Sequence, residues 1–145
     1  MTTPETDTSP EDGKSPLYYI SLDRITQLGR SPVFVLAERR GPSAPSRLKA
    51  DSDLNNPKEL IDEIAEYSAN DQDFIRSDMP LQEIVFRILL GRRNEPTPLR
   101  DLHFELTEKW STPIRPISIT ERGLGRILND DTYYGFEQQD QPDDD

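Results

Sequence analysis

Between residues 81 and 89 of this 145-residue chain, apolar side chains recur with the period of an α-helix. The positions i, i+3, i+4, i+7 and i+8 are occupied by Leu81, Ile84, Val85, Ile88 and Leu89. Asp78 and Pro80 are expected to start this helix, and Gly91 is expected to end it. A helix with such a regular apolar face must bury that face against other elements, so we expect a small core around it.

A second helix is predicted directly after the first. Thr97 is its expected cap and Pro98 its first residue, because proline is well suited to the first helical position. Its inward side chains are predicted to be Leu99, Leu102, Leu106 and Trp110. The residues STPIRP then turn the chain towards a third helix.

The third helix is predicted over residues 119–128, where Ser118 and Glu121 match an S-x-x-E capping box. Its apolar side carries Ile119, Leu124, Ile127 and Leu128. Its opposite side carries Arg122, Arg126 and Asn129. The following run TYYGF, residues 132–136, has the composition of a strand, so this half of the chain is predicted as three helices and a strand.

The N-terminal half gives weaker signals. Residues 17–20, LYYI, favour a strand, and Ser21 can cap a short helix that Gly29 closes. Residues 31–41 fit a helix with Ser31 as cap and proline at its first position, but their VFVL run also fits a buried strand. The capping residues favour the helix.

A Pro-, Ser- and Asn-rich linker is predicted over residues 41–57. Asn56 then caps a further helix, with Pro57 at its first position and Glu59 at its third. One face of this helix carries Leu60, Ile61, Ile64 and Tyr67. Residues 67–80 are predicted to form a loop.

Composition limits the class of protein. Only 32% of the residues are hydrophobic and 13 are proline, which predicts one small domain with unfolded segments. The net charge of -11 opposes non-specific attraction to phosphate. The chain has no cysteine, no signal-peptide pattern and no apolar run of membrane-spanning length, so we expect a cytoplasmic protein without a membrane partner.

The C-terminal half resembles a winged helix-turn-helix domain. The residues that carry the resemblance are Pro116-Ile117-Ser118, Leu124-Gly125-Arg126-Ile127-Leu128 and Gly135, a pattern similar to that of the winged-helix tails of phage and plasmid primases. Helicase- and restriction-associated helix-turn-helix modules are also similar. The resemblance covers about residues 80–137, and it implies a mainly α fold, a helix-turn-helix of winged type with a small β component.

Composition and the resemblance together predict a domain organisation. Four segments are expected: a disordered leader over 1–16, a helical and β segment over 17–50, the helix-turn-helix domain over 51–137 with its core at 80–137, and an acidic disordered tail over 138–145.

By the same resemblance, the helix over residues 119–128 is the recognition helix and lies in the major groove of double-stranded DNA. The guanidinium of arginine can donate two parallel hydrogen bonds to a guanine edge or a phosphate, and the amide of asparagine can pair with adenine. The candidate nucleic-acid-binding residues are Arg122, Arg126, Asn129, Gly125 and Arg115. The expected function is non-enzymatic DNA binding in transcription or other DNA transactions.

Two features favour a protein partner instead. Only one β-rich run follows the third helix, so no strand-turn-strand wing is evident, and TYYGF can pair with LYYI near the N-terminus. Asp130, Asp131 and the acidic tail place negative charge where a wing would meet phosphate. The alternative function is an adaptor or accessory subunit that docks on a protein through the same domain.

No catalytic chemistry is predicted. His103 is the only histidine, and the sequence offers neither metal ligands at suitable spacing nor a nucleophile to complete a hydrolase triad. The run Asn129-Asp130-Asp131 is more typical of a turn at a helix end than of a metal site. We therefore expect no enzyme activity, no cofactor and no metal.

Overall fold

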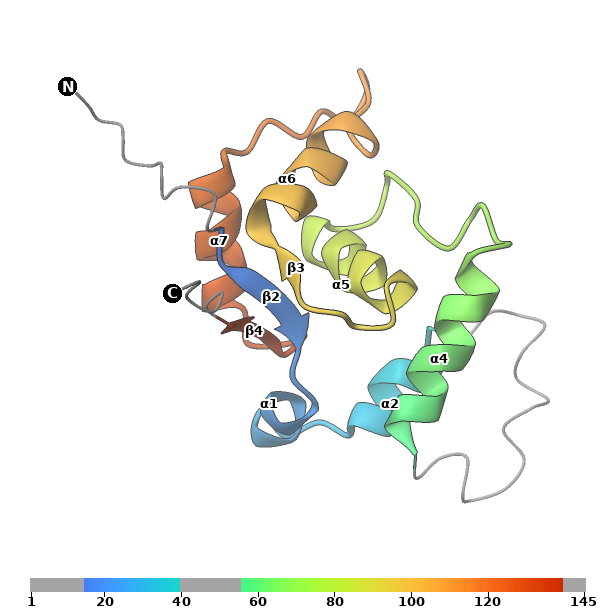
Figure 1. Cartoon of the computed structure of the whole chain (residues 1–145). Helices are drawn as coiled ribbons and strands as arrows, with labels where there is room; N and C mark the ends of the chain where they lie inside the picture. The colour runs from blue at the N-terminus through green and yellow to red at the C-terminus, as the bar shows by residue number, and fades with distance from the viewer. Residues whose placement is uncertain (1–14, 40–55, 140–145) are drawn as a thin grey trace, which may run out of the picture.

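The computed structural model describes residues 15–39 and 56–139, which fold into a mainly helical protein with a small antiparallel sheet (Figure 1). The N-terminal part contains β2 (Leu17–Ile20), α1 (Leu22–Gln27) and α2 (Pro32–Ala37). The C-terminal part contains α4 (Pro57–Ser68), α5 (Leu81–Gly91), β3 (Thr97–Pro98), α6 (Leu99–Glu108), α7 (Glu121–Asp130) and β4 (Phe136–Gln139). The predicted mainly α class with a small β component is confirmed.

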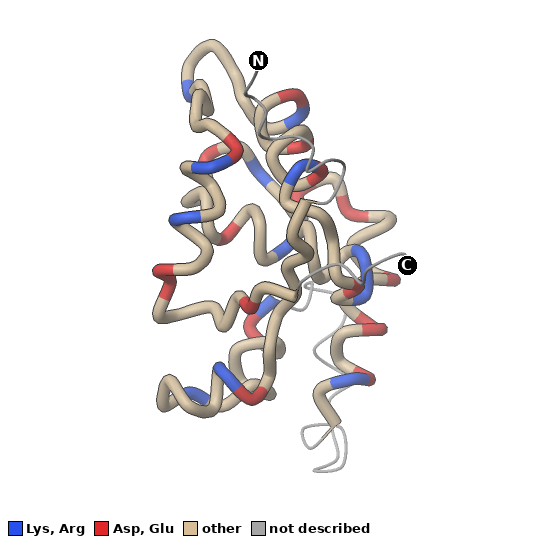
Figure 2. Tube along the Cα trace, turned by 60° about the vertical axis from the view of Figure 1, so that its left-hand side comes forward, with Lys and Arg blue, Asp and Glu red and all other residues tan. Residues whose placement is uncertain are grey.

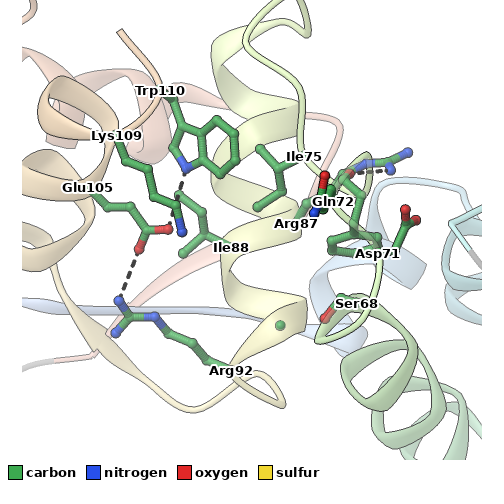
Figure 3. Close-up of a pocket in the computed structure, with 12 residues that line it drawn as sticks. Ser68, Asp71, Gln72, Ile75, Arg87, Ile88, Arg92, Glu105, Lys109 and Trp110 are labelled. Atoms are coloured by element: carbon green, nitrogen blue, oxygen red, sulfur yellow. Dashed lines mark hydrogen bonds and ion pairs between the residues drawn. The ribbon is translucent and has the colours of Figure 1, made fainter.

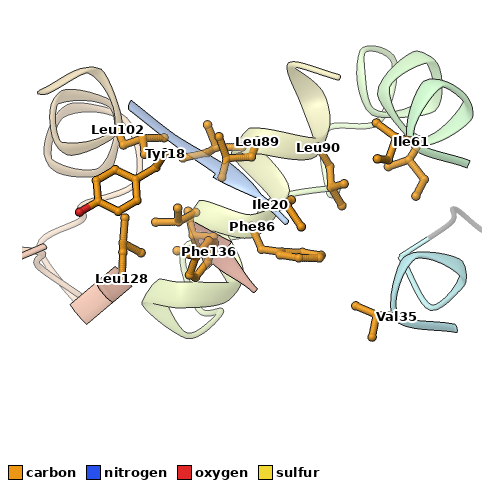
Figure 4. Close-up of a cluster of buried hydrophobic side chains, with 14 of the residues drawn as sticks. Tyr18, Ile20, Val35, Ile61, Phe86, Leu89, Leu90, Leu102, Leu128 and Phe136 are labelled. Carbon is orange, nitrogen blue, oxygen red and sulfur yellow. The ribbon is translucent and has the colours of Figure 1, made fainter. Parts of the chain in front are cut away.

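Helix α5 lies at the centre of the fold. It contacts α4 on one side and α6 and β2 on the other, so side chains around most of its circumference are buried, as expected for a helix enclosed by other elements. Its most deeply buried residues are Ile84, Val85, Phe86, Leu89 and Leu90. Figure 4 shows Phe86, Leu89 and Leu90 among core residues from β2, α6, α7 and β4. The predicted amphipathic helix is therefore more completely enclosed than its apolar pattern indicates.

The sheet has the order β3-β2-β4, with β2 as its central strand. Strand β2 is antiparallel to both neighbours, with Leu17 opposite Pro98 and Ile20 opposite Phe136. Of the run TYYGF, only Phe136 pairs with LYYI as expected, and residues 137–139 make the other pairs. The predicted bounds of that strand are wrong, because β4 starts at Phe136 and continues to Gln139, into the predicted disordered tail.

Residues 132–135 form a turn rather than the first part of that strand. The carboxylate of Asp131 accepts backbone hydrogen bonds from Tyr133 and Tyr134, at 3.0 and 2.6 Å. Gly135 has a φ of +81°, and a Cβ there would lie 2.6 Å from a side-chain carbon of Ile25. The turn therefore requires glycine for both its backbone conformation and its close packing.

Helix α6 is capped by residues distant in the sequence. Thr97 and Pro98 belong to β3, so Thr97 does not cap the helix as predicted. Instead, the backbone N–H of Arg100 donates to Ser15 Oγ at 3.0 Å, and that of Leu99 donates to the carbonyl of Pro16 at 2.8 Å. Ser15 is buried, which also corrects the predicted disordered leader over 1–16 at its last two residues. The other leader residues, most of the predicted linker and residues 140–145 lie outside the described ranges.

The start of α7 also differs from the prediction. Thr120 is the cap, and its hydroxyl oxygen accepts the backbone N–H of Gly123 at 2.9 Å. Ser118 is exposed and precedes the cap, so the helix spans Glu121–Asp130 rather than residues 119–128. The sequence offers two hydroxyl residues, and the apolar packing of Ile119 before the helix favours the later one.

Helix α5 begins and ends near the predicted residues, but Asp78 does not cap it. Pro80 is its N-cap without a side-chain hydrogen bond, while the carboxylate of Asp78 pairs with Arg76. Gly91 is the last helical residue, and the chain turns at Arg93 and Asn94, which have positive φ angles. The Asn94 side chain hydrogen-bonds both the N–H and the carbonyl of Ile20, and so fixes the end of β2 to this turn.

The other capping predictions are confirmed. Ser21 caps α1, Ser31 caps α2, and Asn56 caps α4, each by accepting a backbone N–H three residues later. Residues 32–37 are therefore helical, as their capping residues favoured. Gly29, with a φ of +87°, follows α1 as predicted.

Candidate nucleic-acid interface

Helix α7 has a buried side and an exposed side. Leu124, Gly125 and Leu128 face the core, whereas Arg122, Arg126 and Asn129 are exposed as predicted. The helix packs against α6 and β4, at the edge of the molecule (Figure 1). The sequence period therefore predicted the orientation of α7 correctly, although the predicted bounds were two residues too early.

Arg122 and Arg126 are four positions apart and so lie one helical turn from each other. Within the described residues, neither guanidinium forms an ion pair or a side-chain hydrogen bond. Arg126 borders a shallow hollow of about 320 Å³, whose other walls include Gln82 of α5 and the end of α7. Two cationic groups with free donors are thus presented side by side at the surface.

Asn129 lies on the flank of this face and is already engaged. The hydroxyl of Tyr18 lies 2.9 Å from Asn129 Oδ1 and 3.0 Å from Gln138 Oε1. Because a phenol has one hydrogen, it donates to one amide and can accept from the other. Burial raises the pKa of Tyr18, although its hydrogen bond to Asn129 acts in the opposite direction. Asn129 therefore joins α7 to the sheet, and only its remaining polar groups can meet a ligand.

Gly125 lies on the buried side of α7. A Cβ at this position would lie 3.1 Å from a methyl carbon of Leu99 and 3.6 Å from the hydroxyl oxygen of Tyr18. The glycine therefore permits close packing of α7 on the core. It is not part of the exposed face.

Arg115 lies in the segment before α7, and its guanidinium donates to the carbonyl of Ser77 at 3.3 Å. It lines a hollow of about 360 Å³ together with Met79, Leu81 and Ile117, and this hollow is separate from the one beside Arg126. The five candidates are therefore not one cluster. Arg122, Arg126 and Asn129 share a face, whereas Gly125 is inside and Arg115 is elsewhere.

Charge around α7 is mixed. Figure 2 shows acidic and basic residues interspersed along most of the described trace, without a continuous basic stripe. Asp130 is exposed on α7 itself, while the carboxylate of Asp131 is occupied by the turn that follows. A phosphate backbone would thus be held by discrete arginine contacts rather than by a broad positive field.

A buried charged cluster connects the residue after the C-cap of α2, helix α5 and the turn before β4, and no sequence pattern predicted it as a whole. Glu83 accepts four hydrogen bonds: from Arg39 Nη2 and Tyr134 Oη at Oε1, both at 2.8 Å, and from Arg39 Nε and Arg87 Nε at Oε2, at 3.1 and 2.7 Å. Arg39 is 7% exposed and also stacks over Phe86. The only local signal was the i, i+4 spacing of Glu83 and Arg87.

This cluster shifts the pKa values of its members. Burial alone would raise the pKa of Glu83, but hydrogen bonds from Arg39 and Arg87 together lower it below its ordinary value. Burial raises the pKa of Tyr134, and its hydrogen bond to Glu83 raises it further. Because Glu83 accepts hydrogen bonds from Arg39, Arg87 and Tyr134, the cluster joins separate parts of the fold.

A second surface lies beside the C-terminal part of α6. A pocket of about 450 Å³ is lined by apolar groups, including Phe74, Ile75, Ile88 and Trp110, and by charged groups at its rim. Figure 3 shows the ring of Trp110 beside Ile75 and Ile88, with its N–H directed to Glu105, which in turn pairs with Arg92. Trp110 is partly buried against the core, in partial agreement with its predicted inward position.

Phe104, which the sequence analysis passed over, is 65% exposed on α6 and lines an adjoining hollow of about 470 Å³. Its exposure could have been predicted, because Phe104 does not fall on the helix face that carries Leu99, Leu102 and Leu106. His103 has a structural contact, because its Nε2 lies 2.7 Å from the carbonyl of Ile119. The residues at this end of α6 form an apolar and charged surface without a nucleophile paired to a base.

Within the described ranges, no three His, Cys, Asp or Glu side chains gather closely enough to hold a metal ion. No helix in these ranges has the length and apolar character needed to cross a membrane. Comparisons of the chain with protein-family models, with curated proteins and with solved structures find no match.

Proposed function

We propose that this chain is a non-enzymatic, cytoplasmic DNA-binding protein of winged-helix type that takes part in transcription or another DNA transaction. The observation that carries the proposal is the exposed face of α7, where Arg122 and Arg126 lie one turn apart without an ion-pair partner among the described residues. The order α5, β3, α6, α7, β4 is compatible with the winged-helix resemblance and makes α7 the third helix.

The proposed contact uses α7 alone. The buried side of α7 is fixed by the core and by the Tyr18 hydrogen bonds, so its exposed side is held rigidly towards a groove. The strand beside β4 is β2, from the N-terminal side of the chain, and this pairing takes the place of a wing hairpin. Twelve residues, 109–120, separate α6 from α7, which is longer than the short turn of the simplest helix-turn-helix.

The test measures the affinity of the full chain for duplex DNA by fluorescence anisotropy, over a range of salt concentrations. Residues 15–20 have to be kept, because they supply the central strand and the cap of α6. We expect measurable binding at low salt that weakens steeply as salt rises, and its loss in the Arg122→Ala, Arg126→Ala double variant.

A charge-matched control is available outside α7. Lys58 and Arg76 are both exposed and lie before α5, so the Lys58→Ala, Arg76→Ala variant removes the same charge without changing α7. Equal loss of affinity in the two double variants, or no binding by the full chain at low salt, contradicts the proposal. A smaller loss in the control supports a localised contact at α7.

A second candidate function is protein docking as an adaptor or accessory subunit. The observation that favours it is the exposed ring of Phe104 next to the hollow that contains Asp101 and Glu108. Aromatic anchors with a polar rim are typical of protein interfaces, and the rim here is of mixed charge because Arg92 and Lys109 also line the hollow.

This candidate is tested by photocrosslinking in cells from a reactive side chain introduced at position 104. The same group at position 66, which is exposed on α4, is the control. A defined crosslinked protein from position 104 alone, persisting after nuclease treatment, favours the docking function. Equal labelling from both positions contradicts it.

A further inference from the structure

The end of β4 lies beside α7. Gln138 is connected to Asn129 through the hydroxyl of Tyr18, with distances of 3.0 and 2.9 Å. Gln139, the last residue of β4, is paired with Leu17. Two residues before Leu17, the Ser15 hydroxyl lies 3.4 Å from the carboxylate of Glu121, the first residue of α7. The chain therefore leaves the sheet alongside the helix that carries Arg122 and Arg126.

The segment that follows has the length to reach both arginines. It comprises six residues, 140–145, which span up to about 20 Å when extended. Along α7, Arg126 and Arg122 lie about 5 and 10 Å from Asn129, from the helical rise per residue. These distances along the helix axis are shorter than the extended length of the segment.

The charges are complementary. Residues 140–145 contain four aspartates, Asp140, Asp143, Asp144 and Asp145, and no basic residue. The two guanidiniums on α7 have no carboxylate partner within the described residues. Asp130 and Glu121 also lie on α7 and repel the segment, but neither forms an ion pair with Arg122 or Arg126, whose donors remain available to other carboxylates.

We propose that residues 140–145 bind across Arg122 and Arg126 and compete with DNA phosphates for them. The contact itself is independent of the proposed function, but its effect on DNA binding rests on that function. Because the segment is tethered next to its site, its effective concentration is in the millimolar range, so individually weak ion pairs suffice. The segment lowers affinity for DNA most at low salt and selects ligands that offer several phosphates at once.

The contact is tested first without DNA. The chain has no cysteine, so Gln141→Cys allows a spin label to be attached at one position while all four aspartates are kept. We expect the label to broaden the NMR signals of Arg122 and Arg126 side chains at low salt. The broadening is expected to decrease at about 1 M salt, where the screening length is about 3 Å.

The matched control carries the same label together with Asp140→Asn, Asp143→Asn, Asp144→Asn and Asp145→Asn, which keeps the length and removes the charge. Loss of broadening in this chain supports the electrostatic contact. Broadening that is absent from α7 in the chain with four aspartates, or unchanged by the asparagines, overturns the proposal.

The second measurement compares DNA affinity. A chain ending at residue 139 and the four-asparagine chain are both expected to bind duplex DNA about 3- to 10-fold more tightly than the full chain at low salt, a range set by two or more exposed ion pairs. In the Arg122→Ala, Arg126→Ala background this difference is expected to vanish. A gain that persists in that background overturns the competition.

The two measurements separate the possible failures. If the label broadens α7 and none of the chains binds DNA, the intramolecular contact is supported and the proposed DNA-binding function fails. If DNA is bound through α7 and the label leaves α7 unaffected, the function is supported and the tail contact fails.

Discussion

Two pairs of arginines in this protein have opposite environments. Arg39 and Arg87 converge on the buried carboxylate of Glu83, where their side chains are 7% and 20% exposed. Arg122 and Arg126 are exposed on α7 without an ion-pair partner among the described residues. The first pair joins three parts of the fold, since the cluster also includes Tyr134. The second pair contributes nothing visible to packing.

The contrast indicates how to separate structural from functional arginines in an acidic protein. A buried guanidinium needs a carboxylate because its desolvation is costly, so partner and burial occur together. An exposed guanidinium has no such requirement. The chain has 28 acidic residues. Two neighbouring arginines that form no ion pair with any described acidic residue are therefore candidates for binding an anion from another molecule.

Glu83→Ala should break the structural pair. It leaves the buried Arg39 with only the exposed carboxylate of Glu38, at 3.3 Å, so we expect the free energy of unfolding to fall by about 3–5 kcal/mol. Urea denaturation followed by circular dichroism measures this change. The control is Asp62→Ala, which removes an exposed ion pair to Arg93 and should change stability by less than about 1 kcal/mol. Similar losses in both variants contradict the contrast between buried and exposed pairs.

Acidification should weaken the same cluster reversibly. The pKa of Glu83 is lowered in the folded state, so its stabilisation is present above the unfolded value of about 4.5 and is lost as pH falls through the lower folded pKa. The loss should be smaller than that of Glu83→Ala, because a protonated acid can still hydrogen-bond. Denaturation at several pH values should show the stability difference from Glu83→Gln narrowing below about pH 4.5. A constant difference would argue that the charge of Glu83 is unimportant.

Tyr134→Phe removes one of the four hydrogen bonds to Glu83. We expect a loss of about 1.5–3 kcal/mol, the range for a hydrogen bond to a charged group. The neighbouring Tyr133 is a matched control, because its ring stacks against Arg30 at 3.8 Å and its hydroxyl has no hydrogen-bond partner within the described residues. Thermal unfolding should show little change for Tyr133→Phe. A larger loss of stability in Tyr133→Phe than in Tyr134→Phe would contradict a stabilising role for the hydrogen bond between Tyr134 and Glu83.

The smallest effect on stability is expected at the exposed pair. The Arg122→Ala, Arg126→Ala variant should change the free energy of unfolding by less than about 0.5 kcal/mol, as is usual for surface substitutions, while it removes DNA binding. Chemical denaturation and anisotropy on the same preparation measure both properties. A loss of stability comparable with that of Tyr134→Phe would assign these arginines a structural role.

Features encoded by neighbouring residues could be predicted from the sequence. Ser21, Ser31 and Asn56 cap their helices as expected, because each bonds a backbone N–H only three residues away. The exposed face of α7 follows from helical periodicity in the same way. Local chemistry therefore fixed most helices and the orientation of the candidate site.

Features that depend on distant residues could not be predicted. Ser15 caps α6 across 85 positions, and Arg39 meets Glu83 across 44. Likewise, the burial of Gly125 depends on where Leu99 and Tyr18 lie in space. Neither capping patterns nor periodicity contains this information, so the sequence placed Gly125 with the exposed candidates and missed the charged cluster.

The central position of β2 has a consequence for how the chain is made. Strand β2 is synthesised early and β4 late, and the hydrogen bond between Tyr18 and Gln138 spans 120 residues. The helices can form while translation continues, whereas the sheet has to wait until its last strand emerges, which predicts slow closure. A chain whose translation stops before Phe136 exposes one edge of β2, and unfinished chains can associate through that edge.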